Sequence, residues 1–310
     1  MKIRIFISVC FLFLSQLTLV LAQSDEDYEE YAVYSRKGVA MGLYLGSYFP
    51  NKYPATLYDG YGYDLEGNKR DFQNSWMYNK IMNQYGKNAP NFGGIDQISQ
   101  ALGVQSDQWY FDDEDYMPVN MRFKSAFSIG LNTRFSQDGK NGVVFNVNAS
   151  LLKAAGNFTI KTTPPPGSTQ INNSLQTFEI SGQEQRLHFQ AGYQGILGPE
   201  EGIQFFIEGG LHATLAKFGK NEIQINDLVI DLTEEYNNNA GDIFFTGKKP
   251  VGLGFGAFAG LGFDVNTSGP WDLQLVYNPI LEKVNIGWDP KLKLSQSVGL
   301  RCYYKLSAKS

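Results

Sequence analysis

Residues 121–136 have the sequence MRFKSAFSIGLNTRFS, in which apolar and polar residues alternate almost without interruption. Phe127, Ile129 and Leu131 fall on one parity, and polar residues such as Asn132 fall on the other. Successive side chains of a β-strand point to opposite faces, so this segment has one apolar face and one polar, charged face. Its length is that of a strand tilted across an outer membrane.

Seven further stretches alternate in the same way, so the sequence predicts eight strands. The other seven cover residues 39–46, 143–151, 186–194, 203–215, 251–265, 271–278 and 292–306. Connections after the second, fourth and sixth strands are short and the others are long, as in barrels with short periplasmic turns and long extracellular loops. We therefore predict an all-β fold: an eight-stranded antiparallel up-and-down transmembrane β-barrel over residues 38–306, with both chain ends in the periplasm.

A soluble barrel that buries its apolar face in a central calyx is the competing interpretation. A soluble barrel with the opposite parity inside would enclose a large number of charges, those of Arg122, Lys124, Arg134, Arg186, Glu208, Asp264, Lys293 and Arg301. It would also have to explain the eight apolar stripes on the other parity, because soluble proteins rarely expose large apolar surfaces. The pattern favours the transmembrane barrel, with outer-membrane lipid against the apolar face.

The N-terminal residues predict export. Lys2 and Arg4 precede an apolar stretch that ends at the small residue Ala22, which is the pattern of a cleaved signal peptide over residues 1–22. Residues 23–37 are then an acidic periplasmic segment, and 307–310 are a C-terminal tail. The chain has 26 basic and 31 acidic residues, a net charge of −5, which argues against a nucleic-acid partner.

The layout resembles the eight-stranded outer-membrane barrels of gram-negative bacteria, of the OmpA-transmembrane and OmpX kind. The glycine-rich stretch 251–265 and the ending 297–306 are similar to the PorT-like outer-membrane β-barrel family in particular. This resemblance implies an outer-membrane location. It also implies an accessory role in a secretion or surface-assembly system.

The inward side chains are predicted to fill the barrel, because the interior of eight strands is just wide enough for side chains. Charges held there need partners, so we expect a salt-bridged network. Its predicted members are Arg122, Arg186, His188, Glu208, His212, Asp264 and Arg301. A narrow pore for small or apolar solutes is the alternative function.

Catalysis is a more distant alternative. His188 and His212 are the only histidines, and both share the predicted interior with Glu208 and Asp264. A His–carboxylate pair could act as a general base in an integral-membrane enzyme. No serine-centred motif accompanies the pair, and the spacing indicates no third metal ligand. We predict a non-enzymatic protein without catalytic, cofactor or metal sites.

Residues 51–115 form a first loop of unusual length, and loops this long are usually functional or disordered. Helices are expected over residues 73–85 and 94–102, so the loop is predicted to be a partly helical extracellular cap that binds a protein or a glycan. Exposed aromatic residues would supply the contacts. The candidates are Tyr61, Tyr63, Trp76, Tyr78, Trp109 and Tyr110.

Two alternatives concern the same loop. The aromatic residues could instead pack on one another and only close the barrel mouth. The acidic run 112–115 could bind calcium, but it lacks the alternate-residue spacing and glycine of an EF-hand loop, which favours a solvated acidic surface. The sequence does not indicate the oligomeric state.

Overall fold

The computed structural model describes residues 36–64, 66–164, 174–198, 202–238, 251–266, 269–286 and 290–306. The predicted signal peptide, nearly all of the acidic segment 23–37 and the tail 307–310 lie outside these ranges. No helix in the described part of the chain is long and apolar enough to cross a membrane.

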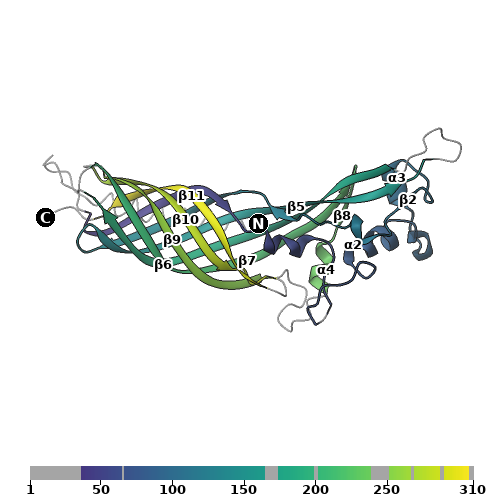
Figure 1. Cartoon of the computed structure of the whole chain (residues 1–310), viewed down its shortest axis with the longest axis horizontal. Coiled ribbons are helices and arrows are strands. Elements are labelled where there is room, and N and C mark those ends of the chain that lie inside the picture. Colours follow the sequence, from purple (N-terminus) through teal and green to yellow (C-terminus); the bar gives the residue numbers. More distant parts are fainter. Residues whose placement is uncertain are drawn as a thin grey trace, which may run out of the picture. The chain divides into compact units, whose positions relative to one another are not determined.

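Eight of the described strands form a closed antiparallel ring, which confirms the predicted fold class (Figure 1). β1 pairs with β4 on one side and with β11 on the other, and the β5–β6 pairing completes the circle. The ring strands are β1 (Gly38–Phe49), β4 (Ala126–Ser136), β5 (Asn141–Thr162), β6 (Ser174–Leu197), β7 (Gly202–Ile225), β9 (Val251–Asn266), β10 (Trp271–Lys283) and β11 (Leu292–Lys305).

The ring exposes its apolar parity and buries its polar parity. On β4, Phe127 and Leu131 are 65% and 44% exposed, whereas Asn132 is 1% exposed. The same holds at the end of β11, where Tyr303 is buried and its neighbour Tyr304 lies on the other face, packed against Trp271. A wall that is apolar outside and polar inside fits a lipid environment, since outward side chains of such barrels face lipid.

β5, β6 and β7 continue beyond the other strands at the end of the long loops. They have 22, 24 and 24 residues, compared with 11 in β4. Along β6 the two faces exchange polarity. Phe189 is outside and Arg186 inside, but nearer the start of the strand, at its cap end, Glu179 is outside and Ile180 is inside. We call the level at which the faces exchange the rim, and we expect the strand to pass from lipid into water there.

Residues 51–125, which contain the predicted cap 51–115 and are called the cap from here on, pack on the inner, apolar face of this extended sheet. The elements of the cap are η1 (Tyr53–Tyr58), α2 (Trp76–Tyr78), η2 (Asn79–Gln84), η3 (Ala89–Phe92), α3 (Gln97–Leu102), β2 (Trp109–Tyr110), η4 (Glu114–Tyr116) and β3 (Arg122–Phe123). β2 pairs with the end of β5, and β8 (Leu228–Asp231) pairs with the end of β7 before α4 (Thr233–Asn238). Figure 1 shows these elements gathered around the extensions of β5 and β7.

Aromatic contacts hold the cap to the extended strands. The Tyr58 ring stacks on Phe218 of β7, with centroids 5.3 Å apart, and Trp76 meets Tyr236 of α4 edge-on at 4.5 Å. Gly182 of β6 makes room for Tyr58, because a Cβ atom there would lie 2.2 Å from the ring. The helical elements are shorter than the predicted 73–85 and 94–102, and none exceeds six residues.

The structure corrects the predicted strand 121–136, which is interrupted after β3. Arg122 pairs with Ala155 and Ser128 with Ser150, so the segment containing β3 and β4 holds one residue more than the facing part of β5. An extra residue of this kind is a β-bulge, and it moves every side chain before it to the other face. Arg122 is therefore exposed, and its predicted place in the lumen is wrong.

Candidate functional site: the barrel lumen and the rim groove

Charged side chains fill the lumen in equal numbers of each sign. Among the described residues of the interior, the cations are the buried Arg134, Arg186, Arg301 and Lys305 and the partly buried Arg36, and the buried carboxylates are Glu184, Glu208, Asp264, Asp272 and Glu282. Each carboxylate contacts at least one of these cations. A low-dielectric interior tolerates charge only when it is paired in this way.

Glu208 and Arg301 form a two-pronged ion pair near the middle of the lumen. Both Arg301 terminal nitrogens donate to the Glu208 carboxylate at 2.7 Å, and both side chains are almost fully buried. Gln194 adds a third donor to the same carboxylate at 3.1 Å. The pairing of Glu208 with an inward arginine is as predicted.

Asp264 and Asp272 occupy the end of the lumen nearer the short turns. Arg134 bridges them at 3.4 and 3.0 Å, and Lys305 lies 3.0 Å from Asp272. Arg36, which precedes β1, also contacts both carboxylates and so closes this end of the interior. The predicted membership of Asp264 is correct, but its partners are Arg134 and Arg36.

A second cluster near the rim contains two acids that the sequence analysis did not single out. Glu184 lies 2.6 Å from Arg186 Nε, and Glu282 lies 3.2 Å from Arg186 Nη1. The predicted strands stopped at Arg186 and at Asn278, although β6 and β10 continue beyond these residues. Continuing the inward parity by two and four residues would have found Glu184 and Glu282.

The two histidines lie side by side in this rim cluster, with ring centroids 5.4 Å apart. Their carboxylate neighbour is Glu282, at 3.8 Å from His188 and 3.5 Å from His212, and not the predicted Glu208 or Asp264. Thr214 Oγ1 lies 2.7 Å from His212 Nε2 and donates to Glu282 at 2.8 Å. In a nucleophilic triad the carboxylate holds the ring nitrogen opposite the nucleophile. Here both groups lie on the Nε2 side, so the arrangement is not a triad.

The structure corrects the expected exposure of the cap aromatics. Four of the six are buried, namely Tyr61, Tyr63, Trp76 and Trp109, whereas Tyr78 and Tyr110 are partly exposed. Trp109 is fully buried and donates from Nε1 to Asp96 at 3.2 Å. The alternative in which the aromatics pack inside the cap fits these four better than exposure does, and Tyr63 and Trp76 meet edge-on at 6.1 Å.

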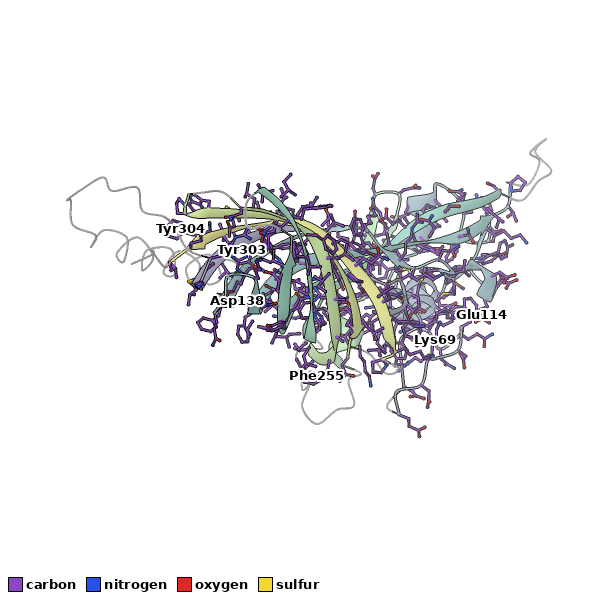
Figure 2. The ribbon with its side chains drawn as sticks, turned by 60° about the vertical axis from the view of Figure 1, so that its left-hand side comes forward. Lys69, Glu114, Asp138, Phe255, Tyr303 and Tyr304 are labelled. Carbon is purple, nitrogen blue, oxygen red and sulfur yellow. The ribbon has the colours of Figure 1, made fainter. Side chains whose placement is uncertain are left out.

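A groove of about 1430 Å³ lies between the cap and the rim of the barrel. We call it the rim groove. Its lining includes Lys52, Tyr53, Asp59, Tyr61, Lys69, Arg122, Phe123, Lys124, Glu179 and Lys293. The bulge that exposes Arg122 and Lys124 therefore also directs them to this groove. Figure 2 shows Lys69 on the cap side of the molecule, with Asp138 at the other end.

Two ionisable groups of the groove have shifted pKa values. Burial raises the pKa of the Asp59 carboxyl, and the ammonium group of Lys69, 2.8 Å away, opposes that shift. Burial, reinforced by Glu114, raises the pKa of Tyr61, whose hydroxyl donates to Glu114 at 2.9 Å. Lys69 also covers the Tyr61 ring at 3.6 Å from the centroid.

The acidic run 112–115 has partners of its own. Asp113 accepts from the backbone N–H of Asp115 at 3.0 Å and begins η4, and Glu114 accepts from Tyr61. Neither contact directs several carboxylates at one point, as calcium coordination requires. The solvated interpretation stays a prediction.

A closed eight-stranded ring with an apolar exterior and a paired, charged interior defines the class: the chain is a transmembrane β-barrel of the outer-membrane kind. No protein-family model and no curated protein matches it. Solved structures of the same class do resemble it at 10–11% identity.

Three such structures illustrate the resemblance. Neisserial surface protein A aligns over 60% of this chain and 91% of its own, with a TM-score of 0.35. Ail of Yersinia pestis, in complex with the heparin analogue sucrose octasulfate, aligns over 86% and 98% with a TM-score of 0.33. OprG of Pseudomonas aeruginosa aligns over 88% and 99% with a TM-score of 0.38. Values this low carry no argument about function.

Proposed function

We propose that this protein is a non-enzymatic outer-membrane barrel whose rim groove binds an acidic glycan outside the cell. The proposal keeps the predicted binding role of the cap but moves the contact surface from the buried aromatics to the groove. The short connections lie at one end of the barrel and the cap at the other, which supports an extracellular cap and periplasmic chain ends.

The charge of the rim groove is the observation that carries the proposal. Five cations line it, against the two carboxylates Asp59 and Glu179, although the whole chain has a net charge of −5. The cations are Lys52, Lys69, Arg122, Lys124 and Lys293. A concave surface with one prevailing sign of charge attracts ligands of the other sign and concentrates them.

Aromatic rings give the same groove an amphipathic wall. The ammonium groups of Lys291 and Lys293 lie 5.1 and 5.4 Å from the centroid of the Tyr53 ring. Tyrosine combines an apolar face with a polar tip, and a carbohydrate ring offers the matching combination of C–H and hydroxyl groups. An acidic glycan therefore fits the groove better than an apolar solute does.

The lumen supports a binding role over catalysis or transport. The histidine cluster lacks the order of a nucleophilic triad, and paired side chains occupy the interior from Asp272 at one end to Glu184 at the other. The accessory role in secretion implied by the PorT-like resemblance stays a prediction.

Titration of a sulfated oligosaccharide of the heparin type into the detergent-solubilised barrel tests the proposal. We expect saturable, salt-sensitive binding that falls at least about tenfold in the double variant Lys124→Gln/Lys293→Gln, because each charge contributes on the order of 1 kcal/mol at contact distance in water. The matched control is Lys153→Gln/Lys217→Gln, which removes the same charge from the outer face of β5 and β7. Equal losses in both double variants, or no binding by the unmodified barrel, would contradict the proposal.

A further inference from the structure

His188, His212 and Glu282 bring one ligand atom each to a common point inside the barrel. Their nearest nitrogen and oxygen atoms all lie within 4.8 Å of one another, and all three residues are buried. We propose that these residues form a binding site for a transition-metal dication, with Zn²⁺ as the ion that the donor set fits best. The site is separate from the rim groove and does not depend on glycan binding.

The spacing of the ligand atoms fits a metal centre. Glu282 Oε2 lies 3.5 Å from His212 Nε2 and 3.8 Å from His188 Nδ1. Two ligands bound tetrahedrally to zinc at 2.0–2.1 Å are about 3.3 Å apart, as the bond lengths dictate. The two carboxylate–imidazole distances therefore lie within about 0.5 Å of the spacing that tetrahedral coordination requires.

Thr214 provides a fourth oxygen at the same point. Its hydroxyl lies 2.7 Å from His212 Nε2, 2.8 Å from Glu282 Oε2 and 3.5 Å from His188 Nδ1. Four donors from three strands thus enclose one small volume. The hydroxyl, or a water molecule in its place, completes a four-coordinate set of the kind that zinc adopts.

The Glu282 carboxylate is oriented for this role. Its Oε1 atom accepts from Ser295 at 2.7 Å, from Arg186 at 3.2 Å and from Tyr48, while Oε2 is turned toward the histidines. Hydrogen bonds to the far oxygen of a ligating carboxylate fix its position and are typical of metal sites. Glu184 also pairs with Arg186, at 2.6 Å. The two carboxylates and the one guanidinium group therefore keep one net negative charge, which a bound cation would balance.

The donor types select the class of ion. Two imidazole nitrogens with one carboxylate suit zinc and the neighbouring first-row dications, whereas magnesium and calcium prefer all-oxygen sites. The ligands come from β6, β7 and β10, and β9 separates β7 from β10 in the ring. A bound ion would therefore link β10 to the β6–β7 pair, with which β10 shares no backbone pairing, just inside the rim.

Metal titration of the barrel without its signal peptide, and without a polyhistidine tag, tests the proposal. The protein would be stripped with a chelator and titrated with Zn²⁺ by calorimetry and with Co²⁺ by visible absorption. We expect one ion per chain and a Co²⁺ spectrum of four-coordinate, nitrogen-ligated metal. His188→Asn and His212→Asn should each reduce the affinity by about 100-fold or more, since loss of a ligand exceeds the 10–100-fold effect of losing a supporting hydrogen bond.

The matched control is Asp112→Asn/Asp115→Asn, which removes two exposed carboxylates of the cap and should leave zinc binding unchanged. Heat-modifiable gel mobility checks that each variant is folded, and Glu282→Gln serves as the third ligand variant if a histidine variant does not fold. The proposal would be overturned if the folded, unmodified barrel bound no zinc. It would also be overturned if the folded His212→Asn variant bound zinc as tightly as the unmodified barrel.

Discussion

Replacing Glu208 with glutamine tests whether paired charges hold the lumen together. Arg301 would keep its charge but lose the carboxylate to which both terminal nitrogens donate at 2.7 Å. The new amide would also point an N–H group at Arg301 or at Gln194, which donates to the same carboxylate at 3.1 Å. Removing one partner of a buried ion pair costs about 3–5 kcal/mol, so we expect the free energy of unfolding to fall by that amount.

The measurement is reversible denaturant unfolding of the barrel in lipid vesicles, followed by tryptophan fluorescence. The control is the double variant Glu208→Gln/Arg301→Met, which removes the stranded cation and should recover most of the lost stability. A loss of less than about 1 kcal/mol for Glu208→Gln alone, which is the range of exposed pairs, would show that water reaches this part of the lumen and would refute the reasoning.

The remaining predictions concern the lipid face, the cap, the lumen and a turn. Leu131→Arg should cost about 2–4 kcal/mol in the same assay because Leu131 faces lipid, whereas Thr177→Arg on the polar part of β6 should be nearly neutral. Trp109→Ala should destabilise the cap by about 3–5 kcal/mol, seen as protease cleavage within residues 51–125 while the barrel keeps its heat-modifiable mobility. Planar-bilayer recordings should show no large, stable channels, since paired side chains occupy the lumen. Hydrogen bonds from the backbone of Asn141, then its side chain and Lys140, lower the pKa of Asp138 to about 2. Because its folded-state pKa is lowered, the ionised Asp138 stabilises the turn above the usual carboxyl pKa, and this stabilisation is lost as the pH falls from about 4 to 2. The protection of the turn amides against hydrogen exchange, corrected for the intrinsic pH dependence of exchange, should fall in that window, and Asp138→Asn should remove this change.

Alternation alone was sufficient to predict the ring and most of its interior. Arg186, His188, Glu208, His212, Asp264 and Arg301 all lie inside, as their parity indicated. Parity predicts the orientation of these side chains because lipid requires apolar residues outside, whereas the packed interior holds polar residues. Neighbouring residues in a strand therefore alternate in polarity, and the apolar face identifies the inward residues. Arg122 is the exception, since a bulge of one residue cannot be seen in a pattern that looks regular on both of its sides.

The rim and the cap could not be predicted in the same way. Above the rim the inner face of β5, β6 and β7 becomes apolar, so Glu184 and Glu282, which lie beside that transition, were missed. Whether Trp76 and Trp109 are buried depends on α4 and β5, which they contact and which are distant in sequence. The third neighbour of the two histidines comes from β10, and no local spacing could have indicated it.

Depth-resolved quenching along β5 tests the membrane assignment most directly. Single cysteines at Val147, Leu151, Asn157 and Lys161, in a Cys302→Ser background, would carry a fluorophore in vesicles that contain lipid-attached or water-soluble quenchers. All four side chains point outward, but the first two lie below the rim and the last two above it. We predict lipid quenching at Val147 and Leu151 and aqueous quenching at Asn157 and Lys161. Aqueous quenching at all four positions would contradict a transmembrane barrel.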